Sequence, residues 1–359
     1  MKSGYWRAVF ILAGTTIGAG IFGIPYVTAQ SGYFVGLTWL IVLTIVTLAT
    51  NLAYAYVIEH SSTSRPTQLV SYGQQAFGKP GRLFALFVIL FGQWGALLVY
   101  IIGMGQFLAV LIRYDGGIMP LSLLCYGLLS LVVLINLKRV SILEAWLTVG
   151  MILIVGVIFL SGLGSIRTEN LTQLINWEWA KLLAPYGVIM GALGGYAVIP
   201  EVSRVMKGSQ FGRPLRRRGF YLAVAVGTII PAVVYFLFQL VVVGVSGLAT
   251  SEDAIAGLVP YLNTGIVGIG ALFGLLAIIT SFVTLAYVLR DTFQYDYRLS
   301  GLRSWYLAVI PPLLVYLAGL NSFIVALELM GTWVGTSSTL FIGLILWRNL
   351  TRKESEKNN

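Results

Sequence analysis

Long apolar stretches, separated by short polar ones, run along almost the whole chain. Each continues for about 20 residues or more, the length of a membrane-crossing helix, and none alternates with the period of two that a β-strand requires. The stretches cover residues 5–29, 34–58, 83–112, 117–137, 141–163, 182–203, 219–245, 265–289, 305–319 and 321–347. The pattern predicts an all-α integral membrane protein with about ten transmembrane helices.

Composition supports this prediction and excludes other classes of protein. Hydrophobic residues make up 58% of the chain and charged residues 10%, whereas a soluble domain carries about 25% charged residues. The chain therefore cannot cover a water-exposed surface, which excludes a soluble enzyme and a disordered protein. With a single cysteine, Cys125, and a single histidine, His60, a disulfide framework, a Cys or His metal cluster and a His-based catalytic triad are excluded as well.

The basic residues predict the orientation in the membrane. If an even number of segments crosses the bilayer and the N-terminus is inside, the inner regions hold 20 of the 23 Lys and Arg residues, and the outer loops hold only Arg113, Arg167 and Lys181. This is the bias of the positive-inside rule. We expect a multi-pass protein of the cell membrane with both termini in the cytoplasm. The location of the net charge of +10 indicates membrane orientation rather than a nucleic-acid partner. The basic inner loop 204–218 is interpreted as a topological anchor that also meets anionic lipid headgroups, with a regulatory or nucleic-acid site as the alternative.

Two segments carry helix-breaking residues at mid-span. The first reads Gly14-Thr-Thr-Ile-Gly-Ala-Gly-Ile-Phe-Gly-Ile-Pro25, and the sixth reads Gly191-Ala-Leu-Gly-Gly-Tyr-Ala-Val-Ile-Pro-Glu201. In each, Ile-Pro follows five residues after a glycine, and each segment opens a block of five. Because each block has an odd number of crossings, the second block enters the membrane from the opposite side. We therefore expect an inverted repeat, with residues 1–163 as the first block, 164–348 as the second and 349–359 as a polar cytoplasmic tail.

A helix broken at mid-membrane exposes backbone groups that can bind a ligand. Glycine weakens a helix and proline removes a backbone donor. The amides that begin the second half attract a carboxylate, and the carbonyls that end the first half attract an ammonium or a cation. Two such breaks that meet would bind a zwitterion and a cation. The alternative is that these glycines only allow close helix packing, as in a Gly-x-x-x-Gly motif.

The motifs resemble those of one family. The stretch from Gly14 to Pro25 looks like the first-helix signature of amino acid permeases of the amino acid–polyamine–organocation superfamily. It is closest to the hydroxy/aromatic amino acid permeases and the amino acid transporter transmembrane family. Stretches 95–100, 194–201 and 276–282 are similar to these proteins' third, sixth and eighth helices. The resemblance spans nearly the whole chain and implies the LeuT-type five-plus-five inverted repeat, with helices 1 and 6 discontinuous and substrate at the breaks.

The resemblance also implies roles for single residues. It places the substrate carboxylate at the first break, and the amine and side chain at the second break and near Tyr100. The implied substrate-binding residues are Thr16, Ile17, Gly18, Ala19, Gly20, Ile21, Tyr100, Ala192, Leu193, Gly194, Gly195 and Tyr196. The implied Na⁺ site consists of the carbonyls of Gly14 and Ile17 together with Ala277, Thr280 and Ser281. Proton-coupled relatives share this pattern, so the coupling ion is Na⁺ or H⁺. The alternative is that both hydroxyls bond to carbonyls of their own helix.

Two acidic residues inside predicted spans are further candidates for coupling. Glu201 follows Pro200 just after the second break, and Glu328 lies in the tenth segment between two leucines. An acid within a span is a functional candidate, because a desolvated carboxyl can carry a proton. The alternatives are that Glu201 pairs with a basic residue near the inner surface and that Glu328 lies near the outer mouth.

These features together predict a secondary active amino acid transporter that works by alternating access. We expect cation symport of a neutral or aromatic amino acid, with no cofactor apart from the coupling ion and no nucleic-acid partner. A membrane sensor that binds an amino acid without moving it is the main alternative, and counterflow would distinguish the two. An enzyme is disfavoured because no catalytic groups converge, and a channel because no filter motif is present.

Overall fold

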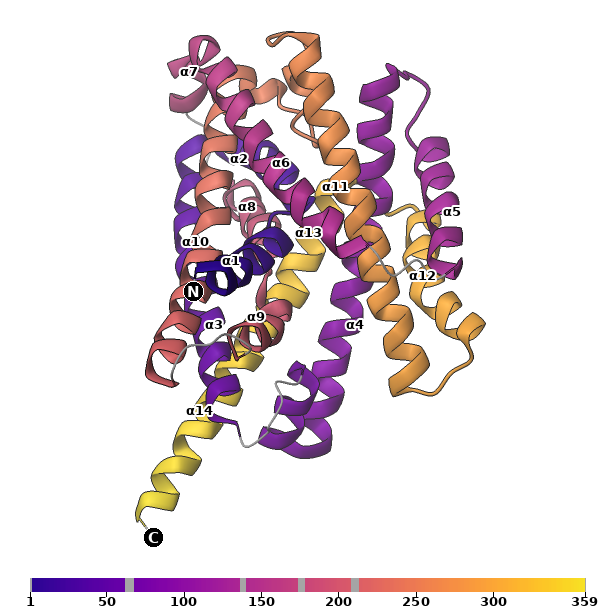
Figure 1. Ribbon diagram of the computed structural model, residues 1–359. Helices are drawn as coiled ribbons and strands as arrows, with labels where there is room; N and C mark the ends of the chain where they lie inside the picture. Colours follow the sequence, from indigo (N-terminus) through magenta and orange to yellow (C-terminus); the bar gives the residue numbers. More distant parts are fainter. Residues whose placement is uncertain (1, 62–67, 136–139, 174–177, 208–212, 359) are drawn as a thin grey trace.

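The chain folds into a bundle of helices (Figure 1). The computed structural model describes residues 2–61, 68–135, 140–173, 178–207 and 213–358. Within these residues the α-helices are α1 Lys2–Thr16, α2 Gly20–Ser31, α3 Tyr33–His60, α4 Leu69–Ile112, α5 Met119–Ile135, α6 Val140–Gly162, α7 Thr168–Thr172, α8 Trp179–Ala192, α9 Ile199–Lys207, α10 Arg213–Ser246, α11 Thr264–Asp291, α12 Gly301–Leu317, α13 Phe323–Leu329 and α14 Thr336–Asn358. Short 3₁₀ turns are η1 Leu163–Ser165, η2 Tyr196–Val198, η3 Gly247–Ala249 and η4 Ala256–Leu258, and the π-helical turns are η5 Thr292–Asp296 and η6 Met330–Gly335.

Helices occupy all ten predicted segments. Six stretches of the described chain, some of them interrupted by a short turn or a kink, are long and apolar enough to cross a membrane, and the bent pair α1 and α2 makes a seventh. Three shorter apolar helices, Met119–Leu134, Val149–Ser165 and Gly301–Leu317, correspond to the fourth, fifth and ninth segments. The predicted all-α membrane architecture is therefore confirmed.

The first and sixth segments are broken where the sequence predicts. Helix α1 ends at Thr16, α2 begins at Gly20, and their axes differ by 53°. Helix α8 ends at Ala192, and η2 separates it from α9, which begins at Ile199. Glycines at the breaks and a proline in the following helix account for both interruptions, because they weaken helical hydrogen bonding on the two sides of the gap.

Helix α4 and the tenth segment contain features that the hydrophobic pattern does not reveal. A positive φ of 65° at Gly78 divides α4 into a short N-terminal helix and the long spanning one; glycine adopts this conformation without strain. In the tenth segment, η6 interrupts the helix between α13 and α14, and Gly331 lies directly against the backbone of Gly187 on α8. The polar tail is not a separate coil, since α14 continues through it to Asn358.

Buried side chains form two main clusters. The larger, here called the central cluster, joins α2, α4, α8, α10 and α11 and includes Ile21, Phe22, Phe107 and Leu193. The smaller, here called the inner cluster, joins α1, α3, α9, α10 and α14 and includes Leu12. Along the first segment, residues before the break, such as Leu12, belong to the inner cluster, and residues in and after the break, such as Ile17 and Ile21, belong to the central cluster.

The loop between α10 and α11 is folded onto the bundle. Ala254, Ile255 and Leu258 are buried in the central cluster. The carboxylate of Asp253 accepts hydrogen bonds from the amides of Ile255 (2.8 Å) and Ala256 (2.7 Å). Burial raises the pKa of this carboxyl, and these hydrogen bonds oppose the rise in part. The Ser322 hydroxyl before α13 donates to Glu252 at 3.2 Å, so the loop is tied to the tenth segment.

Candidate functional site

The first break leaves two backbone amides free. The Gly18 amide turns back to the carbonyl of Thr16 at 2.9 Å. The amides of Ala19 and Gly20, which come next, have no backbone acceptor among the described residues. Because they stand at the start of α2, where the helix dipole is positive, they are suited to bind an anionic group such as a carboxylate.

The second break leaves a similar pair. The Gly195 amide bonds to the carbonyl of Leu193 at 2.8 Å, and the Val198 amide reaches back to Gly195 at 3.4 Å. The amides of Tyr196 and Ala197 have no backbone acceptor in the described part of the chain. Each break therefore exposes donors at the start of its second half, as expected for two related helix interruptions.

The two breaks touch each other in a reciprocal way. A Cβ atom on Gly20 would lie 2.6 Å from Cα of Ala192, the last residue of α8. A Cβ atom on Gly195 would collide with the hydroxyl of Thr16, the last residue of α1. Each glycine thus packs against the end of the other half-helix, and only a residue without a side chain allows the breaks to approach this closely.

Tyr235 of α10 joins the two breaks from the side. Its hydroxyl lies 2.6 Å from the carbonyl oxygen of Thr16 and 3.0 Å from that of Ala192, and its side chain is 0% exposed. Tyr235 is not among the residues that the sequence predicts for the site. A usable signal was present, because Tyr235 and Gln239 are polar and four residues apart in an apolar segment, which places them on one helix face. Gln239 in turn accepts from Thr28 of α2 at 3.2 Å.

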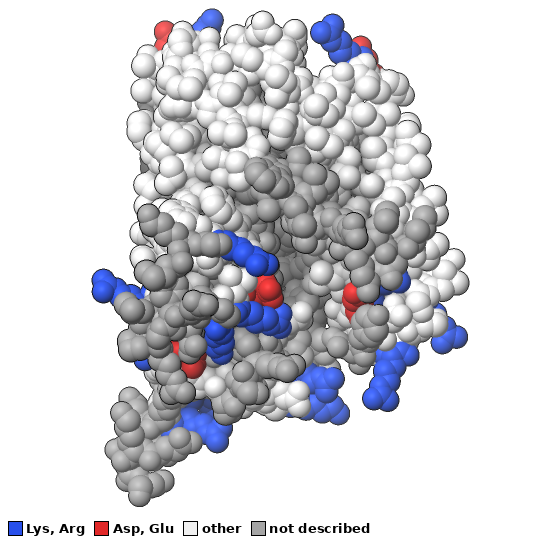
Figure 2. Space-filling view, in the orientation of Figure 1, with Lys and Arg blue, Asp and Glu red and all other residues white. Residues whose placement is uncertain are grey.

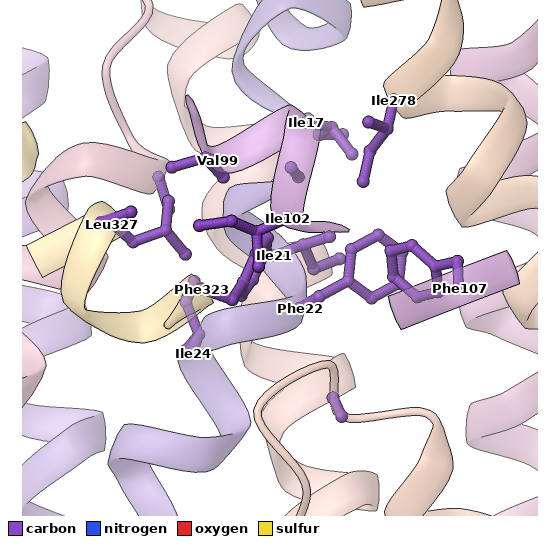
Figure 3. Close-up of a cluster of buried hydrophobic side chains, with 14 of the residues drawn as sticks. Ile17, Ile21, Phe22, Ile24, Val99, Ile102, Phe107, Ile278, Phe323 and Leu327 are labelled. Atoms are coloured by element: carbon purple, nitrogen blue, oxygen red, sulfur yellow. The ribbon is translucent and has the colours of Figure 1, made fainter. Parts of the chain in front are cut away.

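The other residues expected at the substrate site divide into two groups. Tyr100 lies beside the first break, with its hydroxyl 3.8 Å from the Cβ position of Gly18 and within electrostatic reach of Tyr235. Gly194 has open space around it except for carbonyls of α8. Ile17, Ile21 and Leu193 are buried in the central cluster, as Figure 3 shows for the two isoleucines, so they offer the site backbone groups only.

Tyr196 is placed differently from the expectation. Its side chain packs against the inner cluster, and its hydroxyl accepts a hydrogen bond from Ser338 of α14 at 2.7 Å. The hydroxyl is therefore held beside the inner cluster, and the amide of Tyr196 is the group left free at the break. Sequence alone could not separate these two roles, because the turn η2 sets the direction of the side chain.

The residues expected to bind a cation lie on α1, the first break and α11. The Thr280 hydroxyl donates to carbonyls of its own helix, Leu276 at 3.1 Å and Ala277 at 3.0 Å. This is the alternative that the sequence left open. Ser281 forms no side-chain hydrogen bond with the described residues. Gly14 and Ile17 lie on either side of the end of α1, and Ile17 shares the central cluster with Ile278, the residue after Ala277 (Figure 3).

The two acidic candidates differ in their surroundings. Glu201 forms an ion pair with Arg204 at 2.8 Å, and both side chains are about half exposed, at 49% and 52%. Pairing with a nearby basic residue was the alternative stated for Glu201. Glu328 is half-buried on α13, its Cγ lies next to Gly187 of α8, and it has no hydrogen-bond partner among the residues described. Glu328 is thus the less solvated of the two carboxyls.

Comparison with known proteins connects this geometry to a family. The tryptophan/tyrosine permease family matches residues 1–358. The chain is 25% identical over 361 residues to tyrosine-specific transport system 1 of Haemophilus influenzae, covering 95% of this chain and 87% of the relative. It is 26% identical over 352 residues to tyrosine-specific transport system 2 of the same organism, covering 92% and 84%. Glutamine transporter 2 of Aliivibrio fischeri is 23% identical over 363 residues, covering 98% and 90%.

Solved structures share the fold at low sequence identity. The inward-facing conformation of Mhp1 superimposes with a TM-score of 0.64 at 13% identity, covering 94% of this chain and 75% of Mhp1. A manganese transporter of Eremococcus coleocola superimposes with a TM-score of 0.57 at 15% identity, covering 94% and 76%. The likeness to Mhp1 confirms the LeuT-type fold that the sequence predicts.

Proposed function

This chain belongs to the tryptophan/tyrosine permease family, and from that premise we propose that it is a secondary active transporter of an aromatic amino acid. Family membership makes it a transport protein of the membrane and not an enzyme. Two relatives are named as tyrosine-specific transport systems, so tyrosine is the first substrate to test. Alternating access and symport with Na⁺ or H⁺ belong to the proposal.

The observation that carries the proposal is the meeting of the two breaks. The amides of Ala19 and Gly20, at the start of α2, have no backbone acceptor among the described residues, and the carbonyls of Thr16 and Ala192, which end α1 and α8, both lie within hydrogen-bond distance of the Tyr235 hydroxyl. An amino acid presents a carboxylate and an ammonium at its α-carbon, and these match the two kinds of backbone group. A zwitterion can therefore be bound without any charged side chain.

Aromatic side chains near the first break support an aromatic substrate. The rings of Phe22 and Phe107 lie 4.5 Å apart in an edge-to-face arrangement, and Phe238 lies 5.9 Å from Phe22. Edge-to-face contacts of this kind extend readily to one more ring. Phe22 follows the break by two residues, so a substrate held by the amides would direct its side chain toward this group.

For the coupling ion we keep both candidates. The carbonyls of Gly14 and Ile17 with Ala277, Thr280 and Ser281 would form a Na⁺ site if Thr280 exchanged its helix carbonyls for the ion. Glu328 would carry H⁺, since it is half-buried without a described partner, whereas the exposed pair of Glu201 and Arg204 fits an ion pair at the surface.

We also propose that both termini are cytoplasmic and that the two blocks of five spans are inverted repeats. Figure 2 supports the orientation, because the basic side chains gather mainly at the end of the molecule from which α14 projects. The reciprocal contacts of Gly20 with Ala192 and of Gly195 with Thr16 support the repeat, since a two-fold relation between the blocks would set the glycine of each break against the end of the other half-helix.

Uptake by purified protein in liposomes tests the proposal. Labelled tyrosine, tryptophan, phenylalanine, glutamine and leucine would be offered with a Na⁺ gradient and a pH gradient imposed separately. We expect accumulation of an aromatic amino acid with one of the two gradients. Counterflow of tyrosine without any gradient would separate a transporter from a sensor: a protein that binds tyrosine but exchanges none would contradict the proposal.

A further inference from the structure

Gln239 of α10 has a free hydrogen-bonding group inside the bundle. Its side chain is 0% exposed, and its carboxamide oxygen accepts a hydrogen bond from the Thr28 hydroxyl of α2 at 3.2 Å. The carboxamide nitrogen has no partner among the described residues. If the carboxamide is turned over, the nitrogen contacts Thr28 and the oxygen is free instead. In either orientation one end of a buried amide is unpaired, which is unfavourable in the empty protein.

Burial distinguishes Gln239 from two other glutamines of the spans. Gln93 and Gln106 of α4 also carry a side-chain oxygen without a partner in the described part of the chain, but both side chains are only partly buried. Solvent or lipid headgroups can reach such residues, whereas Gln239 is enclosed by protein. The free end of Gln239 is therefore open only to a ligand that enters the bundle.

The surroundings of Gln239 suit an aromatic ring. Phe238 and Gln239 are consecutive on α10 and both contact α2, Phe238 at the ring of Phe22 (5.9 Å) and Gln239 at Thr28. The ring of Phe107 lies 4.5 Å from that of Phe22, and Figure 3 shows these two rings against each other. Such a group offers a further ring edge-to-face contacts, but its apolar surface cannot satisfy a hydroxyl on that ring. The amide of Gln239 can.

The position of Gln239 along α2 matches the length of a tyrosine molecule. Gln239 contacts α2 at Thr28, eight residues after Gly20, and a rise of about 1.5 Å per residue separates these two positions by about 12 Å. A tyrosine whose carboxylate is bound by the amides of Ala19 and Gly20 extends its phenol over most of this distance. Hydrogen bonds of about 3 Å at the two ends of the molecule span the rest.

We propose that Gln239 recognises the phenolic hydroxyl of the substrate and thereby selects tyrosine over other aromatic amino acids. The inference rests on the proposed function and names a specificity-determining residue of that site. A phenol both donates and accepts a hydrogen bond, so it pairs with whichever end of the amide is free, while Thr28 holds the other end. An aromatic amino acid without the hydroxyl leaves the amide unpaired and is bound more weakly.

The test compares L-tyrosine with L-4-methylphenylalanine, which has nearly the same size and carries a methyl group in place of the hydroxyl. Both affinities would be measured by ligand-induced thermal shift on the full-length protein in detergent. The wild type should bind tyrosine about tenfold more tightly, the upper end of the range for one hydrogen bond. Gln239→Met keeps the length of the side chain but removes the amide, so its two affinities should agree within about twofold.

Gln93→Met is the matched control, because it makes the same substitution at another glutamine with an unpaired side-chain oxygen. Residue 93 precedes Phe107 by fourteen positions on α4, a distance of about 21 Å along the helix, so the control should keep the tyrosine preference of the wild type. Loss of this preference in the control as well would overturn the inference. Equal weakening of both ligands in Gln239→Met would assign Gln239 a structural role and also overturn it.

Two further measurements keep the test decisive if Gln239→Met does not fold. Thr28→Val removes the hydroxyl that holds the amide and should reduce the preference for tyrosine by about threefold; an unchanged preference would overturn the inference. Equal affinities for the two ligands in the wild type would overturn it and leave the proposed transport of aromatic amino acids intact. If the wild type binds neither ligand, the proposed aromatic substrate fails, and the inference with it.

Discussion

The two helix breaks share a sequence signature but meet each other through different atoms. Gly20 of the first break lies against the backbone of Ala192, whereas Gly195 of the second break lies against the side chain of Thr16. The first break is also shorter and leads into the buried helix α2, while the second contains the turn η2 and leads into α9, whose Glu201 and Arg204 are exposed. We infer that the first break is the rigid half of the site and the second the adjustable half.

The largest effect is expected from closing the rigid contact. In Gly20→Ala, the new methyl group would lie 2.6 Å from Cα of Ala192. Because this contact is with the backbone, shortening a side chain cannot remove the clash. Overpacking of this kind costs about 1–3 kcal/mol, so we expect substrate affinity, measured by thermal shift, to fall by about 100-fold at the upper end of that range. Gly268→Ala on α11 is the control, because the added atom there has open space. Unchanged affinity in Gly20→Ala would contradict the contact.

At the second break we expect a smaller loss of substrate affinity, which a second substitution should restore. Gly195→Ala brings a methyl group onto the hydroxyl of Thr16 and the end of the Leu12 side chain, both of which can give way, so we expect a loss of affinity of about tenfold, near 1.4 kcal/mol. The added change Thr16→Ala removes the hydroxyl, whose hydrogen bond goes to its own helix at Leu12 (2.9 Å). The double variant should recover most of the affinity. A double variant weaker than Gly195→Ala would show that this contact is as rigid as the first.

The tyrosines next to the two breaks should respond unequally. Tyr100→Phe removes a hydroxyl beside Gly18, and we expect the KM for the substrate to rise by about fivefold, within the range for one hydrogen bond. Tyr196→Phe removes a hydroxyl that accepts a hydrogen bond from Ser338 of α14, and its KM should stay within about twofold. Uptake kinetics in liposomes measure both. A larger KM change in Tyr196→Phe would place its hydroxyl at the substrate.

The smallest effect is expected beyond the second break. Glu201→Gln removes the exposed ion pair with Arg204, and pairs of this kind contribute about 0–1 kcal/mol. Uptake and its dependence on the ion gradient should therefore remain within about twofold of the wild type. Loss of gradient-driven uptake with counterflow retained would instead assign Glu201 a coupling role. Glu328→Gln should be measured in the same way and compared with Glu201→Gln, because the Glu328 carboxyl is the less exposed of the two coupling candidates.

Sequence reasoning reached the fold and the breaks because backbone chemistry is local. Glycine and proline interrupt a helix wherever they occur, so the interruptions after Thr16 and Ala192 could be located from their neighbours alone. The contributions of Tyr235, Thr280 and Tyr196 could not, because they depend on where a side chain points after the helices have packed. The π-helical turn η6, which brings Gly331 onto Gly187, likewise follows from contacts between distant segments.

The central claim is that the two breaks together form one site for a zwitterion. An experimental structure of the protein with bound L-tyrosine tests it most directly. We predict a carboxylate at hydrogen-bond distance, about 3 Å, from the amides of Ala19 and Gly20, and an ammonium at that distance from the carbonyl of Ala192. Tyrosine bound away from both breaks, with these backbone groups left as they are in the ligand-free protein, would contradict the account.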